Sequence, residues 1–188
     1  MATDRDDRRL AAPEDLELVR DFVNTLDVLP GTDQLGEPAS LASWLARHRL
    51  VSTQTTLTDE DVGRAQSLRE ALRAMLLANA GFSFSTEAAE TFNDALRTAR
   101  LRARIGEAGR VKLLPADAEG LDHAIGWLVS IVFAAQENGS WSRLKACAEC
   151  HWALYDRTKN RSAAWCGSRC GARVRARRHR RSRREESA

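Results

Sequence analysis

Apolar residues recur every three or four positions through most of residues 1–140, which is the period of helices with one buried face. The pattern predicts a short helix that Ser40 caps and four longer helices, over residues 14–26, 58–79, 86–97 and 118–138. The residues expected on the buried faces share the helical spacing: Leu16, Val19, Val23, Leu26, Leu41, Trp44, Leu45, Val62, Ala65, Leu68, Leu72, Met75, Leu76, Phe92, Leu96, Leu121, Ile125, Leu128, Val129, Val132 and Phe133.

The period changes to two between residues 101 and 114. Apolar residues alternate with arginines from Leu101 to Ile105, and Gly106–Gly109 turns the chain back, which predicts a β-hairpin with one apolar face. Residues 29–38 are rich in glycine and proline and predict a loop. The expected fold class is therefore α+β, mainly α with one small β-hairpin.

The four cysteines of the chain form two closely spaced pairs near its C-terminal end. Two residues separate Cys147 from Cys150, three separate Cys166 from Cys170, and fifteen lie between the pairs. This arrangement is typical of a structural zinc site, because each pair aims two thiolates at one ion. We expect one zinc ion per chain, held by all four thiolates, with no coordination position left for water.

Other states of these cysteines are two disulfides, free thiols or an iron–sulfur cluster. Disulfides need an oxidising compartment, and the first residues of the chain contain no apolar signal-peptide core. His151 directly follows Cys150 and is an alternative ligand, although a histidine beside a ligand more often lies outside the coordination sphere. The set of four cysteines is the preferred prediction.

Charge divides the chain near residue 140. Residues 141–188 hold 14 Lys or Arg and 4 Asp or Glu, whereas residues 1–140 hold 15 and 22, so the net charges are +10 and −7. An acidic body with a basic end is typical of a protein that presents this end to a polyanion. We expect a helical domain over 1–140 and, over 141–188, a small treble-clef-like zinc finger with four cysteine ligands and a basic C-terminal helix.

Eight arginines follow Cys170 with few apolar residues between them. They predict a helix over 170–184 mounted on the metal site, as in other zinc modules, and a disordered basic tail is the alternative. Arg173 and Arg177, nearest the metal site, are expected to reach bases. Arginine suits bidentate contacts with phosphates and guanine, so we expect double-stranded DNA to contact Arg173, Arg175, Arg177, Arg178, Arg180, Arg181, Arg183 and Arg184.

RNA is the alternative nucleic acid. Proteins that bind RNA or single strands usually interleave aromatic residues with basic ones, and the chain beyond Trp165 has none. Trp152, Tyr155 and Trp165 lie inside the predicted finger, where we expect them to form its small core, with a base-stacking platform as the alternative for one of them. A third hypothesis is a ligand-binding or interaction protein whose basic tail adds nonspecific affinity.

Residues 18–27 (Leu-Val-Arg-Asp-Phe-Val-Asn-Thr-Leu-Asp) and the four cysteines, with Arg157, Asn160, Arg161 and Trp165 between the two pairs, have a recognisable pattern. They resemble the CGNR zinc-finger proteins, whose N-terminal part is the ABATE domain and which are regarded as stress-induced bacterial transcription regulators. The motif Cys-Gly-Asn-Arg reads Cys-Gly-Ala-Arg in this chain, so Ala172 stands where the family has asparagine. The four metal positions are intact.

This resemblance implies a zinc-dependent DNA-binding regulator whose N-terminal domain senses an effector or forms dimers. A homodimer is expected because one finger alone reads little sequence. Asn24 and Thr25 are polar residues in an apolar helix and are candidates for the wall of a small-molecule pocket. The alternative for both is a cap or an interhelical hydrogen bond that satisfies a buried polar group.

The sequence carries no recognisable catalytic motif. Its four histidines are scattered, and HExxH, GxSxG and glycine-rich phosphate loops are missing, so we expect no enzyme. No apolar stretch reaches the roughly 18 residues of a membrane span, so no membrane partner is expected. The expected location is the bacterial cytoplasm, in association with the nucleoid.

Overall fold

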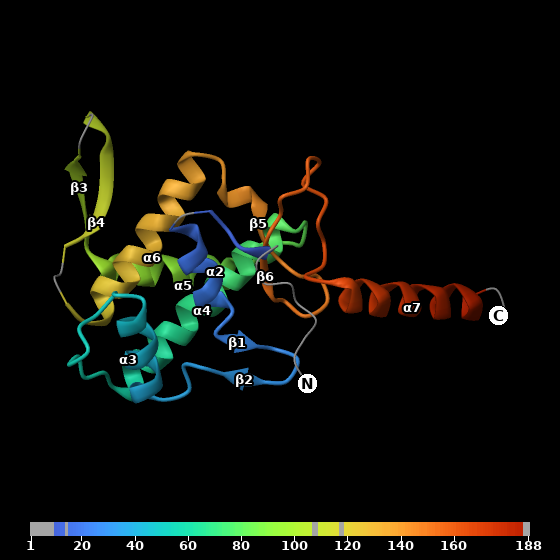
Figure 1. Ribbon diagram of the computed structural model, residues 1–188, viewed down its shortest axis with the longest axis horizontal. Helices are drawn as coiled ribbons and strands as arrows, with labels where there is room; N and C mark the ends of the chain where they lie inside the picture. Colours follow the sequence, from blue (N-terminus) through green and yellow to red (C-terminus); the bar gives the residue numbers. More distant parts are fainter. Residues whose placement is uncertain (1–9, 14, 107–108, 117–118, 186–188) are drawn as a thin grey trace.

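The computed structural model describes residues 10–13, 15–106, 109–116 and 119–185, which form helices joined by short antiparallel strand pairs (Figure 1). The helices are α2 (Leu16–Val23), α3 (Pro38–Arg47), α4 (Asp59–Asn79), α5 (Thr86–Ala99), α6 (Gly120–Glu137), the 3-10 helix η2 (Trp141–Arg143) and α7 (Ser168–Glu185). The strand pairs are β1 (Leu26–Asp27) with β2 (Thr32–Asp33), β3 (Leu101–Ile105) with β4 (Val111–Pro115), and β5 (Leu144–Ala146) with β6 (Ala153–Tyr155).

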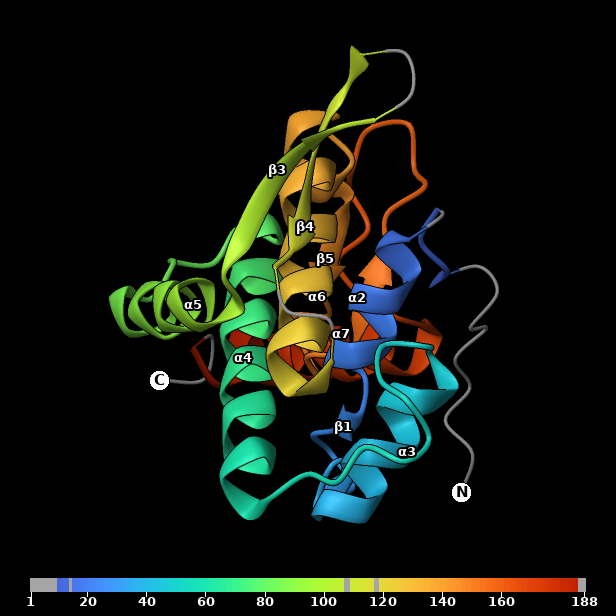
Figure 2. The same cartoon turned by 90° about the vertical axis from the view of Figure 1, so that its left-hand side faces the viewer.

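Helices α4 and α6 lie side by side at the centre of the molecule, and α2 packs against both (Figure 2). The buried face of α4 has the predicted helical spacing, and α6 is apolar on nearly all sides because other elements surround it. Phe133 differs from the prediction, since 44% of this side chain is exposed on α6. The predicted start of α6 at Ala118 lies outside the described residues.

The predicted start of the long helix α4 is confirmed by its cap. The Thr58 hydroxyl accepts a hydrogen bond from the Asp61 backbone N–H (3.2 Å), and the Asp61 carboxylate accepts one from the Thr58 backbone N–H (2.9 Å). This reciprocal pair satisfies two backbone donors that the first turn of a helix otherwise leaves without partners.

The end of α2 and the start of α3 differ from the prediction, and α5 ends at Ala99 rather than at residue 97. Helix α2 ends at Val23 rather than at residue 26, and the chain then forms the β1–β2 pair in a region predicted partly as a loop. Helix α3 begins at Pro38, because proline suits the first helical position, rather than after a cap at Ser40. Ser40 is the third residue of α3, and its hydroxyl accepts a hydrogen bond from the Glu37 backbone N–H (3.2 Å).

Strands β3 and β4 form the predicted hairpin, with Ile105 opposite Val111 near its tip. The predicted turn at 106–109 lies partly outside the described residues. The base of the hairpin packs on α6, and its tip stands at one end of the molecule (Figure 1). Gly126 allows this packing, because a Cβ atom at that position would lie 2.9 Å from Cβ of Pro115.

The apolar core continues across the predicted domain boundary at residue 140. Hairpin β5–β6 packs against α4, and the side chains of Leu144, Ala146 and Ala153 are buried in the same cluster as the helices of the body. Asn79 on α4 donates hydrogen bonds to the carbonyls of Trp141 and Leu144, both at 2.9 Å. The division into 1–140 and 141–188 stays a prediction about independent folding.

Helix α7 projects from the end of the molecule opposite the β3–β4 hairpin (Figure 1). Its 18 residues correspond to about 27 Å of helix. The basic helix predicted over 170–184 is therefore confirmed, and it starts slightly earlier, at Ser168. None of the helices within the described residues is both long and apolar enough to cross a lipid bilayer.

Candidate metal centre and basic helix

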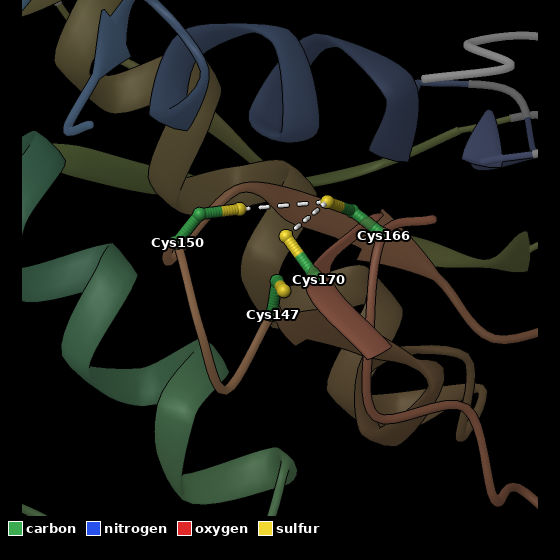
Figure 3. Close-up of side chains that lie close together, drawn as sticks. All are labelled: Cys147, Cys150, Cys166 and Cys170. Atoms are coloured by element: carbon green, nitrogen blue, oxygen red, sulfur yellow. Dashed lines mark hydrogen bonds between the residues drawn. The ribbon is translucent and has the colours of Figure 1, made fainter. Parts of the chain in front are cut away.

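All four cysteines converge on one buried point, as predicted (Figure 3). Their sulfur atoms lie within 4.8 Å of one another. The sulfurs of Cys150 and Cys166 are 3.4 Å apart and those of Cys166 and Cys170 are 3.7 Å apart, whereas a disulfide needs about 2.05 Å. Zinc–sulfur bonds of about 2.3 Å in a tetrahedron place sulfurs about 3.8 Å apart, so the cluster fits one zinc ion.

The backbone of the first cysteine pair forms a tight hook. The His151 N–H donates to the Cys147 carbonyl and the Cys147 N–H donates to the Trp152 carbonyl, both at 2.9 Å. His151 has a left-handed backbone with φ of 58°, which closes the turn. Its side chain does not belong to the ligand cluster of the described residues, so the alternative that His151 replaces a cysteine gains no support.

The second pair belongs to the start of helix α7. Cys166 lies two residues before this helix, and Cys170 lies in its first turn, so the ligand cluster anchors the N-terminal end of α7. The Ala148 N–H donates to the Ala164 carbonyl (3.1 Å) and joins the two hooks. Gly171 permits close packing here, because a Cβ atom would lie 3.2 Å from Nη1 of Arg175 and 3.7 Å from the ring of Trp165.

The pKa values of three of the thiols are shifted, because the cysteines lie close together. Hydrogen bonds with Cys150 and Cys166 lower the pKa of Cys147 to about 2, whereas hydrogen bonds with Cys147 and Cys150 raise the pKa of Cys166 far above its ordinary range. Burial and the charges of Cys147 and Cys150 raise the pKa of Cys170 to about 12. Four thiolates so close together need a cation, because a divalent ion removes their mutual repulsion.

A buried salt bridge supports the chain between the two hooks. Asp156 is completely buried, and its carboxylate accepts hydrogen bonds from Lys145 Nζ (2.8 Å), from the Thr158 N–H (2.9 Å) and from the Ala163 N–H (2.9 Å). Burial raises the pKa of Asp156, but these hydrogen bonds outweigh it and lower the pKa to about 2. The carboxylate therefore fixes the loop 157–163, which presents Arg157 and two further cations to solvent.

All eight predicted nucleic-acid-contacting arginines lie on α7, and their side chains are exposed. Spacings of three and four residues place Arg173, Arg177, Arg180 and Arg184 along one face. Arg177, predicted to reach bases, forms an ion pair with Glu149 of the first hook. The structure thus gathers the predicted metal ligands into one site and leaves the arginines spread along the projecting helix.

Asn24 and Thr25 are both buried, at 5% and 1% exposure, and both bond to the protein itself. The Asn24 side chain donates to the Ala153 carbonyl (3.0 Å) and accepts from the Ala153 N–H (2.7 Å). The Thr25 hydroxyl donates to the Phe22 carbonyl (2.7 Å) and accepts from Arg69 (3.3 Å). These contacts favour the structural alternative over a ligand pocket, which stays a prediction.

Two buried residues that hold the backbone around the metal site, Asp156 and Arg73, were not predicted from the sequence. The sequence does not indicate that Asp156 is buried, because a single carboxylate in a basic stretch has the pattern of a solvent-exposed residue. Arg73 is 3% exposed and donates to the His151 carbonyl (3.0 Å) and the Val23 carbonyl (2.8 Å), so it joins the first hook to the end of α2. The sequence could have indicated this role, because Arg73 and Arg69 both lie on the otherwise apolar face of α4.

Comparison with protein-family models places both parts of the chain. Residues 16–154 match the ABATE model, described as "Putative stress-induced transcription regulator", and residues 143–184 match the CGNR zinc finger. The two matches overlap across hairpin β5–β6, where the body and the finger share a core. A search of curated proteins found no match to the chain.

A helical body that carries a four-cysteine site followed by a basic helix defines a zinc-finger protein. The chain belongs to the ABATE family and ends in a CGNR zinc finger. Its metal centre holds one structural zinc ion with Cys147, Cys150, Cys166 and Cys170 as ligands. Neither family description names an enzymatic activity.

Proposed function

We propose that the chain is a zinc-dependent DNA-binding transcription regulator, in which α7 contacts double-stranded DNA. The observation that carries the proposal is the anchoring of α7: Cys170 in its first turn belongs to the metal cluster, and eight exposed arginines follow it. The positively charged side chains of such a helix repel one another in water. Phosphates along a groove would relieve this repulsion, and the metal site would fix the orientation of the helix.

The metal has a structural role in this proposal. Four thiolates complete a tetrahedron, so no position remains for a reacting water, and binding of the ion stabilises the finger. The arginines then divide by position. Arg173 lies nearest the anchored end and is the best placed to reach bases, whereas those beyond residue 179 mainly neutralise phosphates.

The helical body has the role of sensing an effector or of pairing two chains. One finger with a single helix reads few base pairs, so a specific regulator needs a second copy at a neighbouring half-site. The continuous core between body and finger supports coupling, because a change in the body reaches β5–β6 directly. Such a regulator would act on the nucleoid in the bacterial cytoplasm.

Selection from fragmented genomic DNA, followed by footprinting with RNA as competitor, tests the proposal. We expect a defined protected duplex that RNA does not displace. Preference for RNA would favour an RNA-binding module, and binding to neither would favour an interaction protein with a basic tail. On the selected site, Arg173→Ala should cost about 1–3 kcal/mol and reduce selectivity, whereas Arg183→Ala should weaken all duplexes alike.

A further inference from the structure

A cleft lies beside the first turn of α7 and is not used by the proposed contacts of that helix. Its volume is about 620 Å³, which is within the range of small-molecule sites. The residues that line it include Tyr155, Trp165, Arg157 and, at the start of the helix, Ser168. The cleft therefore combines aromatic surface with a cation.

Trp165 gives this cleft a partly open aromatic wall. The side chain is 38% exposed, which is unusual for the largest apolar residue in a small finger that needs its aromatic residues for packing. The ring packs against Gly171, and Nη1 of Arg175 lies against the same glycine. A planar group that enters the cleft would meet the indole ring with a second guanidinium nearby.

Arg157 is held in position but keeps its charge available. Its guanidinium lies over the Tyr155 ring, 5.6 Å from the ring centroid, and Nη2 donates to the Ala11 carbonyl (2.9 Å). Among residues 10–13, 15–106, 109–116 and 119–185, no carboxylate pairs with Arg157. The buried carboxylate of Asp156 fixes the adjoining backbone, so the cation on the cleft wall is preorganised.

We propose that this cleft binds a nucleotide, with the base against Trp165 and the phosphate beside Arg157. Stacking on an aromatic side chain accepts any base, and a guanidinium pairs well with phosphate. The bound nucleotide is either a free mononucleotide or an unpaired nucleotide of a DNA strand that α7 contacts. The second source rests on the proposed DNA binding, whereas the first does not.

The experiment uses the full-length zinc-loaded chain. Titration calorimetry measures binding of adenosine 5′-monophosphate and of adenosine, and fluorescence anisotropy compares a fully paired duplex with the same duplex carrying one unpaired adenine. We expect binding of the monophosphate, or a preference of about tenfold or more for the unpaired adenine, as for a base stacked on an aromatic ring. The first result assigns a free nucleotide, and the second an unpaired base.

Three variants separate the contacts. Trp165→Leu keeps an apolar side chain without a ring and should abolish the binding of the monophosphate or the preference for the unpaired adenine. Trp165→Phe keeps a ring and should retain most of this affinity. Arg157→Gln should weaken binding of the monophosphate to the level of adenosine. Arg104→Gln, on the β3–β4 hairpin at the other end of the molecule, is the matched control and should leave both affinities unchanged.

Zinc content and circular dichroism verify that each variant folds. If Trp165→Leu fails to fold, the variant of the exposed residue Arg157 is used for the test.

The results distinguish the proposed nucleotide binding in the cleft from the proposed DNA binding by α7. Binding of the paired duplex, with no affinity for the monophosphate and no preference for the unpaired adenine, would overturn the cleft and leave the proposed function intact. Binding of the monophosphate without any duplex binding would support the cleft and contradict the DNA-binding proposal. Affinities that neither Trp165→Leu nor Arg157→Gln changes would also overturn the cleft.

Discussion

Asn24 and Ala153 are 129 positions apart in the sequence and are joined by two hydrogen bonds. The Asn24 amide meets the backbone N–H and carbonyl of Ala153 as a neighbouring strand would. Both residues are buried, so water cannot replace either bond. This contact links the turn after α2 to strand β6, and thereby the ABATE body to the finger.

Asn24→Ala should destabilise the whole chain. The substitution leaves the N–H and carbonyl of Ala153 buried without these partners, at a cost of about 1–3 kcal/mol for each group. Denaturant unfolding followed by circular dichroism measures the loss. Asn160→Ala, on an exposed loop position, is the control and should stay within about 0.5 kcal/mol of the parent chain. Equal stability of the two variants would contradict the structural role of Asn24.

Truncated chains should show how much hairpin β5–β6 contributes to the stability of the apolar core. A chain that ends at residue 140 loses the buried side chains of Leu144, Ala146 and Ala153, whereas one that ends at residue 155 keeps them. We expect the shorter chain to unfold at lower denaturant concentration, because its core is open where the hairpin packed. Identical midpoints would support an independent body that ends at residue 140.

The helices and the metal site could be predicted from local sequence, since both depend on short spacings. The period of three to four residues gave the buried face of α4, and the separations within and between the cysteine pairs gave the four ligands. The capping pair of Thr58 and Asp61 is equally local.

Contacts between distant segments could not be predicted. The pairing of Asn24 with Ala153 depends on where β6 meets the body, and the burial of Asp156 depends on a lysine from β5. Strands β1 and β2 have two residues each, too few for an alternation to be visible. Phe133 is on a helix that is apolar all round, so periodicity could not separate its exposed position from the buried ones.

Asp156→Asn should destabilise the finger by about 3–5 kcal/mol, because Lys145 then keeps its charge in a buried site without an anionic partner. The effect should depend on pH. The pKa of Asp156 in the folded chain is about 2, below its ordinary value of 3.8, so the carboxylate stabilises the fold above about pH 4. This stabilisation is lost as the pH falls from about 4 to about 2.

The measurement is the difference in unfolding free energy between the parent chain and Asp156→Asn at several pH values. The difference removes the contribution of the zinc thiolates, which also take up protons in acid. It should be constant near neutral pH and shrink below about pH 4. A difference that does not change down to pH 2 would show that the Asp156 charge is not the origin of the stabilisation.

Glu149→Gln should strengthen binding to duplex DNA. The carboxylate of Glu149 pairs with Arg177 on α7, so phosphates must compete with it for this guanidinium. An ion pair with an exposed partner is worth up to about 1 kcal/mol, which corresponds to a gain of up to about fivefold in affinity. Glu60→Gln, at the exposed start of α4, changes the net charge equally and should have a smaller effect. Equal gains in both variants would indicate a general charge effect.

The salt dependence of duplex binding, measured by fluorescence anisotropy with and without a zinc chelator, tests the central claim most directly. If the zinc-anchored α7 lies along DNA with four to eight arginine–phosphate contacts, the logarithm of the association constant should fall with the logarithm of salt concentration at a slope of about −4 to −7. Chelation should abolish this binding, because α7 loses its anchor, and a chain truncated after Cys170 should not bind. Binding with the same slope in the presence and absence of zinc would contradict the account.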